Sequence, residues 1–248
     1  MKRQKKSAPQ SPPGVSEIDM ATSLNWFPIN LRLRVESLRA MVKALMQALE
    51  LRRMEFEHKH KVEIKRAFGT GYGFQEDEGF ELFDSVLNEV LKAMLVAIYG
   101  AFEHEAHFLC ECAYADDKTS RPPKSEQRLK DSGEYLRKEC RIRNELFDSR
   151  DWNFLLKMYG VRNGITHAGG LFRRSSTNGK TKDAVQFIDD CRELELNEMH
   201  FIRVNEHMCE RLLGCGERSL VRLCKEAERA NTLGKVVAAG ETKRRRKR

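Results

Sequence analysis

Apolar residues recur at intervals of three and four along two long stretches of the chain. The first series follows Pro28 and consists of Leu31, Val35, Leu38, Val42, Leu45 and Leu49. The second consists of Phe83, Leu87, Leu91, Met94, Ile98, Phe102 and Leu109. This spacing places apolar side chains on one face of an α-helix. It predicts long helices over residues 31–67 and 80–113, packed antiparallel because a glycine-rich turn at residues 69–73 joins them.

A third apolar helix is expected around Trp152. Trp152, Leu155, Leu156 and Tyr159 recur at helical spacing, residues 148–151 provide a cap, and Gly169 with Gly170 ends the helix. Gly164 lies inside this pattern, where glycine costs about 1 kcal/mol relative to alanine. We therefore expect another group, such as a second backbone, to approach Gly164 closely.

The other segments are less regular. Residues 127–142 predict a moderately regular helix, and residues 171–189 are polar and predict a solvated loop. Residues 194–202 indicate a short extended segment or hairpin, and residues 204–230 a last helix that bends at two glycines, Gly214 and Gly216. The fold class is therefore predicted as all-α, with a small β-hairpin after the Trp152 helix.

The positive charge is concentrated at the two ends of the chain. The formal net charge is +8, but residues 1–6 carry four Lys or Arg and residues 243–248 carry six. The residues between them hold 35 basic and 37 acidic side chains. We expect one helical domain over residues 24–230, with flexible basic extensions at residues 1–23 and 231–248. These extensions are either solvated tails or a source of nonspecific affinity for phosphate.

Cysteine usage and hydropathy indicate where the protein works. The seven cysteines form no CxxC pair, which is typical of reduced thiols inside the cell. No long apolar run predicts a membrane span, and the N-terminus lacks the apolar region of a secretory signal. His104 and His107 lie one helical turn apart, but no second pair of metal ligands accompanies them. We expect a cytoplasmic protein without a metal or another cofactor.

Candidate chemistry gathers at the end of the Trp152 helix, where Arg162 and Asn163 precede Thr166 and His167. An arginine fork suits phosphate oxygens, and an imidazole can accept and return a proton near neutral pH. Together they can cleave RNA without a metal. Five residues span about 140° around a helix, however, so His167 shares a face with Asn163 rather than with Arg162. A composite site between two copies of the helix would relieve this mismatch.

The segment Arg162-Asn163-Gly164-Ile165-Thr166-His167 resembles the motif of the HEPN superfamily (higher eukaryotes and prokaryotes nucleotide-binding domains). The upstream residues Tyr99, Glu103 and His104 are also similar to the family's pattern. The resemblance implies a helical bundle, usually dimeric, with metal-independent endoribonuclease activity in many members. It also implies that Glu103 orients Arg162 through a charge-assisted hydrogen bond.

On this resemblance, Arg162, Asn163 and His167 are the catalytic candidates, and Glu103 and Thr166 support them. Arg173 and Arg174 follow closely and are candidates for holding the RNA backbone. The implied partners are RNA and a second copy of the chain, with a protein regulator or antitoxin in a defence or toxin role. Some members carry a tyrosine two residues after the histidine, where this chain has Gly169.

Two other functions remain open from the sequence. The same arginine and histidine can hold RNA or a nucleotide in a noncatalytic binding module. Alternatively, the bundle is structural or binds a protein partner, and Asn163 and His167 only satisfy local groups. A histidine near a helix C-terminus commonly has such a role, because the helix dipole favours a cation there.

Overall fold

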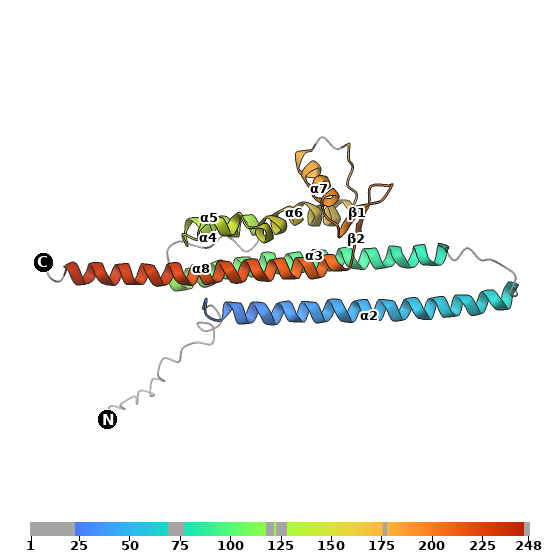
Figure 1. Cartoon of the computed structure of the whole chain (residues 1–248), viewed down its shortest axis with the longest axis horizontal. Helices are drawn as coiled ribbons and strands as arrows, with labels where there is room; N and C mark the ends of the chain where they lie inside the picture. Colours follow the sequence, from blue (N-terminus) through green and yellow to red (C-terminus); the bar gives the residue numbers. More distant parts are fainter. Residues whose placement is uncertain (1–22, 69–76, 118–121, 123–127, 176–177, 246–248) are drawn as a thin grey trace, which may run out of the picture.

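Helices arranged in layers form nearly the whole described part of the chain. The computed structural model describes residues 23–68, 77–117, 122, 128–175 and 178–245. Helices α3 and α8 lie in the middle, with α2 on one side and α4, α5 and α6 on the other (Figure 1). The elements are α2 (Phe27–Phe68), α3 (Asp77–Asp117), α4 (Leu129–Lys138), α5 (Asn144–Phe147), α6 (Arg150–Ala168), α7 (Gly179–Asp189), β1 (Leu194–Leu196), β2 (Ile202–Val204) and α8 (His207–Arg245).

The two long antiparallel helices predicted from the apolar spacing are confirmed as α2 and α3 (Figure 1). The inner face of α2 is fully buried at Leu31 and Val35 and becomes half-buried at Leu38 and beyond. The predicted glycine-rich turn at residues 69–73 lies outside the described residues. The all-α prediction is therefore correct, with a small hairpin as its only sheet among the described residues.

Helix α3 is the central element of the core. Its buried residues include Leu95, Ile98 and Phe102, and it packs against α2, α4, α6 and α8. The segment Phe83–Ala115 has a mean hydropathy of 1.4 and is long and apolar enough to cross a membrane. The core helix of a globular bundle can pass the same test, and α3 packs against α2, α4, α6 and α8.

Helix α8 differs from its prediction in two ways. It continues to Arg245, although residues 231–248 were expected to form a flexible extension. It also runs straight through Gly214 and Gly216, where a bend was expected (Figure 1). A Cβ at Gly216 would overlap the ring of Phe102, so this glycine allows α8 to lie close to α3. Close packing, and not flexibility, explains this glycine.

Two predictions for the segments around α6 were wrong. Residues 171–189 are only partly a loop, because α7 occupies Gly179–Asp189. The side chain of Asn178 accepts a hydrogen bond from Lys180 N at the start of α7, while the α7 residues Ala184, Phe187 and Ile188 are buried. The helix predicted over residues 127–142 is shorter, since α4 ends before Arg141 adopts a left-handed backbone with φ of 53°.

The predicted hairpin is confirmed as two antiparallel strands. Leu194 pairs with Val204 and Leu196 with Ile202. Asn88 of α3 hydrogen-bonds the free backbone groups at the outer edge of β2. Its side chain donates to Ile202 O at 3.1 Å and accepts from Val204 N at 2.9 Å. This contact fixes the hairpin to the core next to the C-terminal end of α6.

All seven cysteines are buried thiols, as expected. Burial raises the pKa of Cys209 and of Cys215 to about 11. A thiolate is the reactive form of cysteine, so these two side chains serve packing.

Candidate functional site

Both ends of α6 are fixed by specific contacts. The Ser149 hydroxyl accepts a hydrogen bond from Trp152 N at 3.3 Å, which confirms the predicted cap. At the other end Gly169 and Gly170 adopt left-handed backbones, with φ of 60° and 85°, and end the helix as predicted. The buried ammonium of Lys92 in α3 donates to Gly169 O at 3.4 Å. A cation at a helix C-terminus is favoured by the helix dipole.

Gly164 is covered by a side chain of the same chain. A Cβ at this position would overlap the ring of Phe172, which is itself buried. The predicted close approach is therefore real, but its agent is Phe172 and not a second backbone. Phe172 occupies the side of α6 toward which a Cβ at Gly164 would point, so a second helix cannot pack against Gly164 on that side while Phe172 stays in place.

Arg162 lies between α6 and α3. Its Nη2 is 3.7 Å from Glu103 Oε2, and its Nη1 donates to Asn163 Oδ1 at 2.8 Å. The side chain of Arg162 is 27% exposed and that of Glu103 is 18% exposed. Glu103 and Arg162 therefore form an ion pair, while the charge-assisted hydrogen bond that the resemblance implied is not present at this distance. The side-chain oxygen of Asn163, the second catalytic candidate, accepts this hydrogen bond from Arg162 and makes no described contact with His167.

The surroundings of Glu103 are partly apolar. Burial raises the pKa of the Glu103 carboxyl, and the charge of Arg162 opposes this shift. Burial also raises the pKa of the Tyr99 phenol, one helical turn earlier in α3. The guanidinium of Arg128 stacks 5.1 Å from the ring centre of Tyr159, beside the same cluster. A half-buried carboxylate of this kind keeps an arginine in place without removing it from solvent.

His167 is exposed at the last turn of α6, and the described contacts of its side chain include no bond to Arg162. Because α6 is a continuous α-helix through both positions, the side chains of Arg162 and His167 leave it in different directions. Thr166 is also exposed, and its hydroxyl donates to Arg162 O at 2.9 Å. The structure therefore brings Glu103 and Asn163 to Arg162 but leaves His167 apart within one chain.

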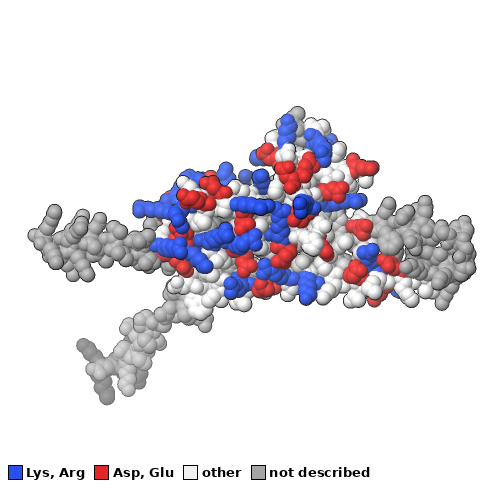
Figure 2. All heavy atoms as spheres, in the orientation of Figure 1, with Lys and Arg blue, Asp and Glu red and all other residues white. Residues whose placement is uncertain are grey.

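The arginines predicted to hold RNA are both exposed. Arg174 forms an ion pair with Asp189 at 2.8 Å, while Arg173 has no ion-pair partner among the residues that the structure describes. A larger basic surface lies elsewhere and was not predicted. Exposed cations line the outer face of α8, where Figure 2 shows Lys and Arg gathered. They are Arg218, Arg222, Lys225 and Arg229, which we call the α8 basic stripe.

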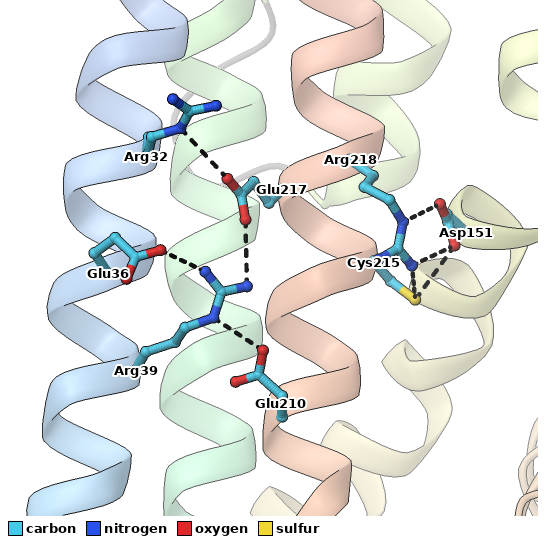
Figure 3. Close-up of polar contacts among 8 residues, drawn as sticks. All are labelled: Arg32, Glu36, Arg39, Asp151, Glu210, Cys215, Glu217 and Arg218. Atoms are coloured by element: carbon cyan, nitrogen blue, oxygen red, sulfur yellow. Dashed lines mark hydrogen bonds and ion pairs between the residues drawn. The ribbon is translucent and has the colours of Figure 1, made fainter.

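Two carboxylates neutralise part of the α8 basic stripe. Asp151 at the start of α6 accepts two hydrogen bonds from Arg218, both at 2.9 Å (Figure 3). These bonds lower the pKa of Asp151. Glu226 is paired with Arg143 at 2.7 Å and with Arg229 at 3.3 Å. Arg222 lies 3.9 Å from Asp151, and Lys225 forms no ion pair within the described part of the chain.

The spacing of the α8 basic stripe was visible in the sequence. Its four residues recur at steps of four, three and four, which place them on one face of a helix. The stripe was not predicted, because the interior of the chain has no excess of basic residues and only the two ends do. Lys92 was also missed, and the signal for it was a single lysine inside the apolar run of α3.

The two histidines of α3 do not form a metal site within the described residues. His104 is exposed and His107 is buried, with His107 Nε2 3.3 Å from Glu111 Oε1. Within the described ranges no three His, Cys, Asp or Glu side chains are grouped to hold a metal ion. A cavity of about 410 Å³ lies between α2 and α3, where Arg34 contacts the buried Glu105 at 2.7 Å.

Comparisons of the chain with protein-family models, with curated proteins and with solved structures gave no match. The resemblance to the HEPN superfamily therefore rests on the segment from Arg162 to His167 and on the residues around it.

Proposed function

We propose that this protein is a metal-independent endoribonuclease of the HEPN type. The observation that carries the proposal is the ion pair between Arg162 and Glu103, which holds a partly exposed guanidinium beside the predicted catalytic segment. An arginine held in this way is preorganised to neutralise the charge that develops on a scissile phosphate. The exposed His167 lies five residues further along the same helix and provides the group that transfers a proton.

The proposed reaction uses the ribose of the substrate. His167 removes the proton from the 2′-hydroxyl, whose oxygen attacks the adjacent phosphorus. The bond to the 5′-oxygen breaks as that oxygen takes a proton from water, and protonated His167 then releases its proton to the solvent. The products are a 2′,3′-cyclic phosphate and a 5′-hydroxyl. Arg162 and His167 are about 7.5 Å apart along the helix axis. We propose that one RNA strand crosses α6 at this level, so that Arg162 contacts its phosphate and His167 its ribose. DNA lacks the 2′-hydroxyl and should not be cut.

The α8 basic stripe supports a polyanionic substrate. Residues 218–229 span eleven residue steps, or about 16 Å of helix. Successive cations in this stripe are therefore spaced for several phosphates of one strand. Cations of this kind supply affinity that does not depend on sequence. A protein regulator and a defence or toxin role, which the resemblance implies, belong to the same proposal.

A noncatalytic RNA-binding module is the second candidate function. It is favoured by the separation of His167 from Arg162 and by the partial neutralisation of Arg162 by Glu103. In that case Arg162 and the α8 basic stripe bind the RNA backbone, and no bond is broken.

The deciding experiment incubates the purified protein with total RNA in EDTA. We expect cleavage by the wild type and at least a hundredfold lower rates for Arg162→Ala and for His167→Ala. His207→Ala removes a histidine that is 77% exposed at the start of α8 and serves as the matched control. If His167→Ala cleaves at the wild-type rate, this segment is not the active site. If the wild type binds RNA without cutting it, the binding module is the correct function.

A further inference from the structure

A cation–π pair lies beside the proposed catalytic arginine. The guanidinium of Arg128, the residue before α4, lies over the ring of Tyr159 in α6, with its Cζ 5.1 Å from the ring centre. Helices α4 and α6 lie on the same side of α3 and α8 (Figure 1). Tyr159 is half-buried against the core, whereas Arg128 is exposed. The ring therefore covers one face of the guanidinium, and the other face is open to solvent.

Arg128 is held at a defined place in the fold. Its backbone N–H donates to Asp131 Oδ2 at 3.2 Å in the first turn of α4. The next residue, Leu129, is buried, and its backbone N–H hydrogen-bonds the carboxylate of Glu103 in α3. These contacts fix the start of α4 against α3. A ligand that contacts the Arg128 side chain therefore meets a backbone that is already ordered.

Glu103 joins this pair to Arg162. Burial raises the pKa of the Glu103 carboxyl, and the charges of Arg162 and Arg128 oppose that rise. Both guanidinium groups therefore act on the same carboxylate, which can neutralise only one of them. Tyr159 and Arg162 lie three residues apart in α6 and are neighbours on its surface. A half-buried aromatic ring and two cations thus form one continuous cluster.

This cluster has the chemistry that binds a nucleotide of single-stranded RNA. Bases splayed from a strand stack on aromatic rings and on guanidinium planes, and the adjacent phosphates bind cations. The open face of Arg128 offers the plane, and the partly exposed Arg162 offers the cation. Stacking depends little on base identity, because every base has a flat π face. The cluster is therefore suited to hold one base without selecting its sequence.

We propose that Arg128, lying on Tyr159, stacks with the base of the nucleotide on the 3′ side of the phosphate held by Arg162. This assignment rests on the proposed function, in which His167 contacts the ribose on the 5′ side of that phosphate. Tyr159 lies about 4.5 Å along α6 from Arg162, and His167 lies about 7.5 Å from it in the opposite direction. A strand that crosses α6 in this order brings its next nucleotide to Tyr159 and Arg128.

RNA binding tests the stacking subsite independently of cleavage. The His167→Ala protein is titrated by fluorescence anisotropy with a short oligouridylate and with an abasic ribose-phosphate strand of the same length. We expect the oligouridylate to bind about tenfold more tightly, and Arg128→Lys in this background to lose that preference. Lysine keeps the charge but has no planar group, so the affinity for the abasic strand should remain.

Arg137→Lys is the matched control for this substitution. Arg137 is exposed in the last turn of α4, away from the start of the helix, and its variant should keep the preference for the oligouridylate. A preference that is absent from the parent protein, or that is equal in Arg128→Lys and its parent, overturns the proposal.

Cleavage tests which side of the phosphate the base occupies. The substrate is a DNA strand with a single ribonucleotide, so that only one bond can be cut. Removing the base of the nucleotide on the 3′ side of this bond should slow the wild type about tenfold, whereas removing the base on the 5′ side of the ribonucleotide should slow it less. Arg128→Lys should cut the intact strand and the strand without the 3′ base at the same reduced rate.

The two measurements separate this subsite from the proposed function. Equal slowing by the two base losses in the wild type overturns the assignment to the 3′ side. If the wild type cuts no RNA, the proposed ribonuclease function fails, and the binding preference still decides whether Arg128 stacks with a base.

Discussion

The ring of Phe172 lies against Gly164 in the second turn from the end of α6. Gly169 and Gly170 reverse the chain immediately after Ala168. This reversal brings Phe172, four residues after the helix, back against Gly164. The contact fixes the loop after α6 against the helix that carries Arg162 and His167. Gly164 is therefore a packing position.

We predict that Gly164→Ala destabilises the protein. Alanine in a helix gains about 1 kcal/mol over glycine, but the new Cβ would overlap the buried Phe172 ring. Overpacking of this kind costs about 1–3 kcal/mol, so the free energy of unfolding should fall by up to about 2 kcal/mol. Urea denaturation followed by circular dichroism measures this change.

Gly100→Ala is the matched control for this prediction. Gly100 lies within α3, and a Cβ there would have no atom within 4 Å. Only the helix preference remains, so this variant should gain about 0.5–1 kcal/mol. Equal effects of the two substitutions would show that the Phe172 contact does not determine the outcome at Gly164.

Long periodic segments were the part of the fold that the sequence predicted well. The apolar spacing of α2 and α3 extends over many turns, and a helix is the only element that buries such a stripe. Helix α7 was not predicted, because its buried residues Ala184, Phe187 and Ile188 repeat the helical spacing over only one turn of an otherwise polar segment. Helix α8 extends further than predicted, because a basic run near the end of a chain is compatible with a helix as well as with a flexible tail.

The candidate site was predictable only in part. The contact between Glu103 and Arg162 followed from the family resemblance, and the structure contains it. The cover over Gly164 was not predictable, because the same glycine fits a crossing helix and a folded-back phenylalanine equally well. The spacing of the α8 basic stripe is readable in the sequence, but only burial shows that this face of α8 is exposed.

The ion pair between Asp151 and Arg218 should make stability depend on pH. Hydrogen bonds from Arg218 lower the pKa of Asp151 below its ordinary value of 3.8. A lowered carboxyl pKa stabilises the fold above the unfolded value, and this contribution is lost as the pH falls through the folded value. Asp151→Asn should therefore reduce the free energy of unfolding by about 1 kcal/mol at pH 7.

The difference between wild type and Asp151→Asn should shrink as the pH falls through the lowered pKa of Asp151, because its carboxyl then becomes neutral like the amide of the variant. Urea unfolding at pH 7 and at pH 3 compares the two proteins. Asp148→Asn at the turn before α6 is the control, because Asp148 is exposed and no ion pair of its side chain is described. A difference between wild type and Asp151→Asn that stays constant with pH would contradict the role of the carboxylate charge.

The α8 basic stripe should contribute directly to RNA affinity. We expect the combined Arg222→Glu and Lys225→Glu variant to bind a single-stranded RNA more weakly, with a shallower dependence of affinity on salt. Each lost phosphate contact reduces the slope of log K against log salt by about 0.7 for a single strand. Fluorescence anisotropy at several salt concentrations, with His167→Ala in the background to prevent cleavage, measures both quantities.

A matched charge reversal tests whether net charge alone explains the effect. Arg52→Glu with Lys59→Glu makes the same change in charge at the far end of α2, where both residues are exposed. This control should retain the salt slope of the parent protein. If both double variants lose affinity equally, the RNA is attracted by the overall charge and does not dock on α8.

Mixing two inactive variants tests whether the catalytic site is complete within one chain. We predict that Arg162→Ala and His167→Ala, unfolded and refolded together, regain no cleavage of RNA. The ring of Phe172 occupies the side of α6 at Gly164 that a second α6 would have to approach. A composite site would give a different result. Half of the randomly mixed dimers would carry one intact site of two, so roughly a quarter of the wild-type rate would return.

Refolding each variant with wild type is the control, and it should retain activity in proportion to the wild-type chains. Recovery in the mixture of the two variants would place Arg162 and His167 of different chains in one site.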